Sequence, residues 1–166
     1  ADKVLHKLKK DLVQKAKNYK KLNMLVNRIN KKKVMLHYSD TSYWSYYEPI
    51  GIKFYKDAIN LMKKKIGSNI EFHIFSNNLS YSKKMSQKIF CNENFKVILM
   101  GKEKLNAHEE FYLMRKYNNF IIPNSTFSWW AAYLSNKKNK LVMIPKKWYY
   151  NQLTTKDRII NKTIII

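Results

Sequence analysis

The sequence has few of the residues that make cross-links and loops. Its 166 residues include one cysteine, Cys91, so no disulfide can form within the chain, and a reducing compartment is the simplest expectation. Because Cys91 follows the apolar pair Ile89 and Phe90, we expect it to pack in the interior. Three glycines and three prolines leave little room for flexible linkers. These shortages predict one folded domain with short connections.

Long apolar runs and acidic side chains are also scarce. No stretch of about eighteen apolar residues occurs, and the first residues lack a signal-peptide pattern, so we expect a cytoplasmic protein without a membrane-spanning helix. The 11 acidic residues include no pair arranged for general acid–base catalysis. No cluster of histidine and cysteine has metal-site spacing, and no glycine-rich phosphate loop is present. We therefore expect no bound metal.

Basic residues dominate what is present. Lysine and arginine number 33, and the net charge is +22. So positive a surface attracts nucleotide phosphates, anionic lipid headgroups or nucleic acid, and charge alone does not choose among them. Abundant lysine, asparagine and isoleucine also match an AT-rich coding sequence, which accounts for part of the charge without a function. A hydrophobic content of 45% predicts a folded chain.

Apolar periodicity divides the chain into elements. Residues 2–30 have the pattern of amphipathic helix, which makes residues 1–32 an N-terminal helical segment ahead of a domain at 33–166. In that domain, predicted strands cover residues 34–38, 70–75, 95–100, 120–122 and 141–144, and predicted helices cover 54–66, 81–90, 107–117 and 127–135. Such alternation predicts an α/β fold, a parallel sheet with helices on both faces. The last apolar run, residues 164–166, is either a final strand or a tether.

Polar residues follow three of these strands. His37 lies at the end of the first, Ser76 and Asn77 end the second, and Ser125 and Thr126 follow the strand at 120–122. Ligands of parallel sheets bind beyond the carboxyl ends of the strands. We therefore predict that these residues converge on one rim of the sheet.

The stretch 124–134 reads N-S-T-F-S-W-W-A-A-Y-L. Pro123 and Asn124 interrupt the strand before it, and the following residues predict a helix. Ser125 and Thr126 at its start either cap the helix or form an anion site with the free backbone N–H groups. From this geometry alone capping is the simpler interpretation. Trp129 and Trp130, inside the helix, are expected in the core.

This stretch resembles the signature of the bacterial α-1,2-fucosyltransferases, glycosyltransferase family 11. Residues 142–149, V-M-I-P-K-K-W-Y, are similar to the family's strand ending in Pro-x-x-Trp, and residues 74–78, I-F-S-N-N, to its Phe-Ser-Asp-Asp segment. The resemblance extends from about Leu5 to the C-terminus. It implies a Rossmann-like domain like the C-terminal half of a GT-B type glycosyltransferase. The implied activity is inverting transfer of fucose from GDP-fucose, without cofactor or metal, to a galactose of a surface glycan.

The resemblance also implies a site and partners. The donor nucleotide and its diphosphate are expected at eight residues: His37, Ser76, Asn77, Asn124, Ser125, Thr126, Phe127 and Ser128. For His37 a structural role at the strand end is equally compatible. The implied partners are a nucleotide sugar and a glycan or lipid-linked glycan acceptor. They place the protein in the cytoplasm, with a peripheral contact to the inner, anionic face of the membrane as a further expectation, and no nucleic acid is expected.

Three departures from the family pattern leave alternatives open. The two arginines of its His-x-Arg-Arg-x-Asp motif fall on Ser39 and Asp40, so the clamp on the leaving diphosphate is missing, with Lys53 a candidate replacement. Asn77 and Asn78 stand where the family has two aspartates, which weakens guanine recognition. The family's opening Gly-Gly-x-Gly-Asn-Gln segment does not occur. A retuned or catalytically impaired nucleotide- or glycan-binding descendant is therefore the alternative, and a basic nucleic-acid-binding domain is the third hypothesis.

Overall fold

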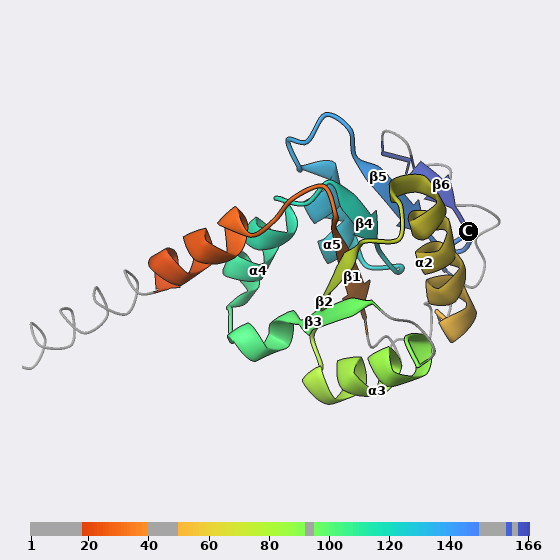
Figure 1. Ribbon diagram of the computed structural model, residues 1–166, viewed down its shortest axis with the longest axis horizontal. Coiled ribbons are helices and arrows are strands. Elements are labelled where there is room, and N and C mark those ends of the chain that lie inside the picture. The colour runs from red at the N-terminus through yellow and green to blue at the C-terminus, as the bar shows by residue number, and fades with distance from the viewer. Residues whose placement is uncertain (1–17, 40–49, 92–94, 150–158, 161–162) are drawn as a thin grey trace, which may run out of the picture.

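A computed structural model describes residues 18–39, 50–91, 95–149, 159–160 and 163–166 (Figure 1). At its centre is a six-stranded sheet in the order β3-β2-β1-β4-β5-β6, with every neighbouring pair parallel. The strands are β1 (Lys33–Tyr38), β2 (Glu71–Ser76), β3 (Lys96–Leu99), β4 (Asn119–Ile121), β5 (Leu141–Ile144) and β6 (Thr163–Ile165). This confirms the predicted Rossmann-like α/β fold, and the last apolar run is a strand.

Helices cover both faces of this sheet (Figure 1). They are α2 (Ile52–Ile66), α3 (Leu79–Ile89), α4 (Ala107–Met114), α5 (Thr126–Tyr133) and the short 3-10 helix η1 (Met100–Glu103), and residues 18–27 are also helical. Helices α2 and α3 pack on one face, whereas α4, α5 and the helix at 18–27 pack on the other. None of the helices in the described residues is both long and apolar enough to cross a membrane.

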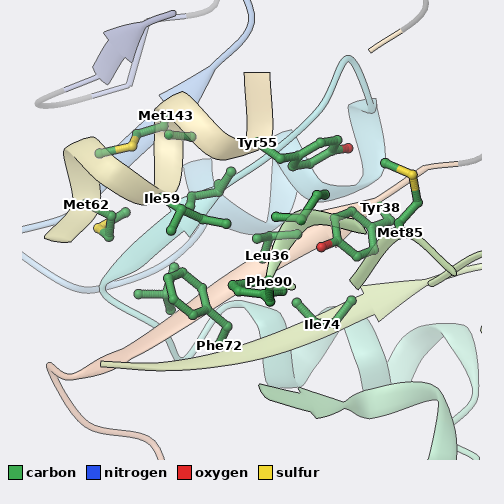
Figure 2. Close-up of a cluster of buried hydrophobic side chains, with 14 of the residues drawn as sticks. Leu36, Tyr38, Tyr55, Ile59, Met62, Phe72, Ile74, Met85, Phe90 and Met143 are labelled. Carbon is green, nitrogen blue, oxygen red and sulfur yellow. The ribbon is translucent and has the colours of Figure 1, made fainter. Parts of the chain in front are cut away.

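The core under α2 and α3 follows from amphipathic periodicity. Helix α2 buries residues at three- and four-residue steps, namely Tyr55, Ala58, Ile59 and Met62. Their side chains meet those of β1 and β2, whose apolar runs are buried on both faces as parallel strands require (Figure 2). Three lysines in the last turn of α2 suit its dipole. Gly67, at a φ of 90°, closes that helix by donating its N–H to the Lys63 carbonyl at 2.9 Å.

The core on the other face is closed by small residues of α5. Ser128, Ala131 and Ala132 are the buried positions of this helix, and they bring its backbone close to the sheet. Trp129 is partly buried and packs against this core, whereas Trp130 is turned outward and is 48% exposed. The expectation that Trp130 lies in the core was wrong, because α5 is apolar on all sides and its pattern does not show which side is buried.

Two further expectations need correction. Helix α4 ends at Met114, not at Tyr117, because Tyr117 turns inward and its hydroxyl lies 2.5 Å from Nδ1 of His73. Cys91 is exposed, not packed. Phe90 ends α3 and occupies the buried position there, so the next residue faces outward.

Candidate functional site

The strand order reverses between β1 and β4, and this switch point is where parallel α/β sheets bind their ligands. From β1 the chain proceeds to β2 and β3 on one side, and from β4 to β5 and β6 on the other. The helices that follow β1 and β4 therefore lie on opposite faces of the sheet, and parallel sheets bind their ligands beyond the carboxyl ends of strands arranged in this way. His37 lies near the end of β1, and Pro123 and Asn124 follow β4. Three polar segments predicted from the sequence thus reach this rim, since β2 with Ser76 lies beside β1.

His37 connects β1 to α5. Its Nδ1 lies 2.9 Å from Oγ of Ser128, and its backbone carbonyl accepts a hydrogen bond from the Tyr55 hydroxyl at 3.2 Å. The Ser128 hydroxyl also lies within hydrogen-bond reach of the Ser125 carbonyl, at 3.3 Å. If the hydroxyl donates to that carbonyl, His37 carries its proton on Nδ1 and donates to Ser128.

Both members of this pair are buried. His37 is 6% exposed and Ser128 is 0% exposed. Burial lowers the pKa of His37 from 6.5 to about 4, because the charged imidazolium loses its hydration there. His37 is therefore neutral at pH 7. It holds the start of α5 against β1, and the pair has little surface with which to meet a ligand directly.

The start of α5 is held in place but not capped. Asn124 is buried and its Nδ2 donates to the Trp148 carbonyl at 2.9 Å, which ties the turn before α5 to the loop after β5. Ser125 occupies the N-cap position with extended backbone, yet its side chain makes no capping hydrogen bond. Ser125 is half-buried, whereas Thr126 and Phe127 are exposed. The first N–H groups of α5 thus lie beside two hydroxyls at the rim.

Helices α3 and α4 begin differently, whereas α2 begins at Gly51, which like Ser125 makes no side-chain cap. Asn78 caps α3 by accepting from the Tyr81 N–H at 3.0 Å. Asn106 and Glu109 form a complete capping box at α4. Capping, the simpler interpretation of Ser125 from sequence, is therefore not what its side chain does.

The turn after β2 gives Asn77 and Asn78 different surroundings. The Ser76 hydroxyl donates to the Asn78 carbonyl at 3.1 Å and accepts from the Asn78 N–H at 3.2 Å. Because Asn78 is also used as the cap of α3, its side-chain oxygen is already engaged. Asn77, the other asparagine of the pair, is exposed at the rim.

The cations near the rim are lysines. Lys53, the candidate replacement for the missing arginines, lies 2.5 Å from Asp57 in an exposed ion pair. Lys146 and Lys147 directly follow β5 and are exposed, and the bond from Asn124 to Trp148 brings their loop to the start of α5. Sequence reasoning missed these two lysines, although they follow a predicted strand end just as His37 and Ser76 do. Asp40 and Ser42, on which two positions of the arginine motif fall, lie outside the described residues.

The chemistry available at this rim is that of anion binding. Apart from Asp57, the carboxylates of the described residues are Glu71, Glu103, Glu109 and Glu110. Glu71 begins β2, Glu103 ends the helix η1 after the edge strand β3, and Glu109 and Glu110 lie in α4, so none of them follows β1 or β4. Within the same residues no group of three histidine, cysteine, aspartate or glutamate side chains can hold a metal ion. Backbone N–H groups, hydroxyls and lysines remain, and these are groups that bind phosphates.

The fold and this rim together define a Rossmann-like domain of the kind that forms one half of a GT-B type glycosyltransferase. The family profile of glycosyl transferase family 11 matches residues 42–165, and the chain belongs to that family.

Two curated relatives from Escherichia coli are similar to this chain. An alpha-1,2-colitosyltransferase is 31% identical over 98 residues, which is 58% of this chain and 32% of that protein. The O-antigen biosynthesis glycosyltransferase WbnK is 30% identical over 96 residues, 58% of this chain and 30% of its own length. The match thus covers about a third of each relative.

Proposed function

We propose that this chain binds the nucleotide-sugar donor for an α-1,2-glycosyltransferase, and that the donor is GDP-fucose. The sugar is transferred to a galactose hydroxyl of a surface glycan. Family 11 membership supports glycosyl transfer, and the name of one relative supports the α-1,2 linkage. The name of the other supports a surface glycan as the product.

The observation that carries this proposal is the start of α5. This helix begins at the switch point of the sheet, with no side-chain cap from Ser125 and with Thr126 exposed beside it. The positive end of the helix dipole and its free N–H groups favour a diphosphate, and the two hydroxyls supply further donors. His37 and Ser128 position this helix start from behind and stay neutral, so they add no charge of their own.

The proposed transfer is a single displacement. The acceptor hydroxyl attacks the anomeric carbon on the face opposite the diphosphate and gives its proton to water, the bond to the phosphate oxygen breaks, and GDP leaves with the electron pair. The configuration is inverted, and no metal takes part. Charge on the leaving diphosphate is stabilised by the start of α5 and by Lys146 or Lys147, which take the place of the family's arginines. Asn77 contacts the base.

A second function is favoured by two observations. Ser39 stands at the position of the first family arginine, and Asn78 is used as a helix cap and not for base recognition. A descendant that binds a nucleotide or glycan without transferring fucose fits these two features.

Calorimetric titration of the chain with GDP, GDP-fucose, ADP and UDP at moderate salt tests both functions. We expect selective binding of GDP and GDP-fucose that falls about tenfold or more in the double variant Ser125→Ala/Thr126→Ala, since two donors to the diphosphate are lost. Ser68→Ala, which removes an exposed hydroxyl far from the rim, is the matched control and should bind as the wild type does. Equal binding of all four nucleotides favours the retuned descendant, and no binding of any contradicts the donor-site proposal.

A further inference from the structure

Large apolar side chains gather on the outer side of α4 and α5. Five residues form this aromatic face, with the following exposed fractions: Tyr112 41%, Phe127 37%, Trp130 48%, Tyr133 50% and Leu134 40%. Four of them lie on α5 or at its end at steps of three and four residues, so they share one side of the helix. An exposed group of this size on a soluble domain marks a contact surface.

The aromatic face is ordered by its own packing. Tyr133 stacks on Trp129 with ring centroids 5.1 Å apart and an angle of 15°, and Trp130 stands edge-on to Trp129 at 5.0 Å. Trp130 also contacts Tyr133 at 5.5 Å. On the neighbouring helix, Phe111 packs edge-on against Phe127 at 5.3 Å. These ring contacts hold the aromatic side chains in fixed orientations.

Cations border the aromatic face. Lys116 Nζ lies 4.1 Å from the centroid of the Tyr112 ring, and Arg115 Nε donates to the Leu134 carbonyl at 3.2 Å. Lys137 and Lys138 lie in the loop after α5 and are exposed. Between residues 107 and 140 the only acidic residues are Glu109 and Glu110, both in the first turn of α4. The border of the face is therefore positive along α4's last turn and beyond α5.

We propose that the aromatic face inserts into the headgroup region of an anionic phospholipid bilayer. Tryptophan and tyrosine rings favour this depth because one part of each ring is apolar and another bonds to water or headgroups. Lysine and arginine around them pair with anionic headgroups. A second copy of the chain is disfavoured as the occupant, since two bodies of net charge +22 repel each other.

The contact has a consequence for the rim of the sheet. Helix α5 has eight residues and is therefore roughly 12 Å long, so its start lies within that distance of side chains that touch lipid. A bilayer-bound chain would hold the rim beside the membrane surface. The lipid contact itself does not depend on the proposed donor binding, and the two are tested separately.

Co-sedimentation with vesicles tests the proposal. We expect the chain to bind vesicles of phosphatidylcholine with phosphatidylglycerol, and to bind phosphatidylcholine vesicles weakly. The double variant Trp130→Ser/Tyr133→Ser should bind the anionic vesicles roughly tenfold less, because two apolar rings no longer leave water. Lys137→Gln/Lys138→Gln should also weaken the binding and reduce its dependence on salt.

Two controls separate the aromatic face from general surface properties. Lys64→Gln/Lys65→Gln removes the same charge from α2, on the opposite face of the sheet, and should bind as the wild type does. Tyr19→Ser removes an aromatic that is 68% exposed outside the face and should also have no effect. An equal loss in the α2 variant, or unchanged binding of Trp130→Ser/Tyr133→Ser, would overturn the proposal. So would binding to single-stranded RNA that needs Trp130 in the absence of any vesicle binding.

Discussion

A buried histidine lies toward the carboxyl ends of the parallel strands and another toward their amino ends, which are called here the carboxyl edge and the amino edge. The two histidines differ in the charge of the groups around them. At the carboxyl edge, Nδ1 of His37 on β1 lies 2.9 Å from the neutral hydroxyl of Ser128, and the described residues offer the imidazole no ion pair. At the amino edge, Nε2 of His73 on β2 lies 2.6 Å from a carboxylate oxygen of Glu71, and its Nδ1 lies 2.5 Å from the Tyr117 hydroxyl. Both histidines are 6% exposed, so burial alone does not distinguish them.

At the amino edge, the charged side chains bond to one another in a network around Glu71. Glu71 accepts from Lys33 at 2.6 Å and from Lys96 at 2.9 Å in addition to His73. Burial raises the pKa of Glu71, but hydrogen bonds from these three partners outweigh that effect and hold it at about 2. Burial lowers the pKa of His73, and the nearby carboxylate offsets this only in part. A neutral His73 therefore donates to Glu71 through Nε2 and accepts from Tyr117 through Nδ1.

At the carboxyl edge, the first backbone N–H groups of α5 have no side-chain cap and are available to bind a ligand. The polar groups beside this helix start are the hydroxyls of Ser125 and Thr126 and, in the loop after β5, Lys146 and Lys147. The amino edge lines a cavity of about 510 Å³, yet its charges already bond to one another. The comparison teaches that a polar cluster in a pocket need not be the ligand site. Groups that lack protein partners indicate it better.

The largest effect should come from breaking the amino-edge network. We expect Glu71→Ala to lower the free energy of unfolding by about 4 kcal/mol, because it leaves Lys33 and His73 without their buried partner. Denaturant unfolding at pH 7 measures this. Lys96→Met removes a partner whose side chain is 69% exposed, and it should cost less than about 1 kcal/mol. Equal costs for the two variants would mean that the network does not stabilise the fold through its buried members.

The next effect is a loss of stability in acid that arises at both edges. The unfolded state takes up a proton on His37 near pH 6.5, but the folded state does so only near pH 4, so the free energy of unfolding should fall between these values by roughly 3 kcal/mol. His73 acts in the same direction. Below pH 4.5, Glu71 adds a further loss that continues to about pH 2.

Replacing His37 separates its contribution to the loss of stability in acid from those of His73 and Glu71. Between pH 6.5 and 4, the free energy of unfolding of His37→Gln should fall less than that of the wild type, by the roughly 3 kcal/mol that His37 contributes. Denaturant unfolding at several pH values measures this difference. Ser68→Ala, at an exposed position without a titratable group, is the control and should leave the profile unchanged. Parallel curves for His37→Gln and the wild type would show that His37 is not held neutral by burial.

A smaller effect is expected when the neutral pair at the carboxyl edge is broken. Ser128→Ala leaves the buried imidazole of His37 without the hydroxyl at Nδ1, which should cost about 2 kcal/mol in unfolding free energy. Ser68→Ala, at an exposed position, should change it by less than about 0.5 kcal/mol. If both substitutions were equally mild, the bond between β1 and α5 would not be an important contact.

The smallest effects compare two helix starts. Asn106→Ala removes a side-chain cap from α4 and should cost about 1 kcal/mol. Ser125→Ala removes no capping bond from α5 and should cost less than about 0.5 kcal/mol, while it weakens GDP binding. Thermal unfolding combined with calorimetric titration measures both. A cost for Ser125→Ala as large as that for Asn106→Ala would mean that Ser125 does cap its helix.

Much of the fold was predictable because parallel strands are buried on both faces and read as apolar runs. The run at 34–38 and the strand β1 agree to within one residue, and the short strand at 120–122 is shifted by one. The approach of His37, Ser76 and Ser125 to one rim also followed from the alternation of strand and helix. The outward side of α5 was not predictable, since a helix apolar all round has no periodic signal.

The sequence by itself determined the family, the parallel sheet and the positions of polar residues at its strand ends, because these depend on local pattern and on short motifs. Only the tertiary structure decided what those residues do. It buries Ser128 against His37, uses Asn78 as a cap, leaves the start of α5 without a side-chain cap, and brings Tyr117 to Glu71 and His73 of β2. The physical reason is that a polar side chain's role depends on its burial and on its partners, and the packing of distant segments sets both.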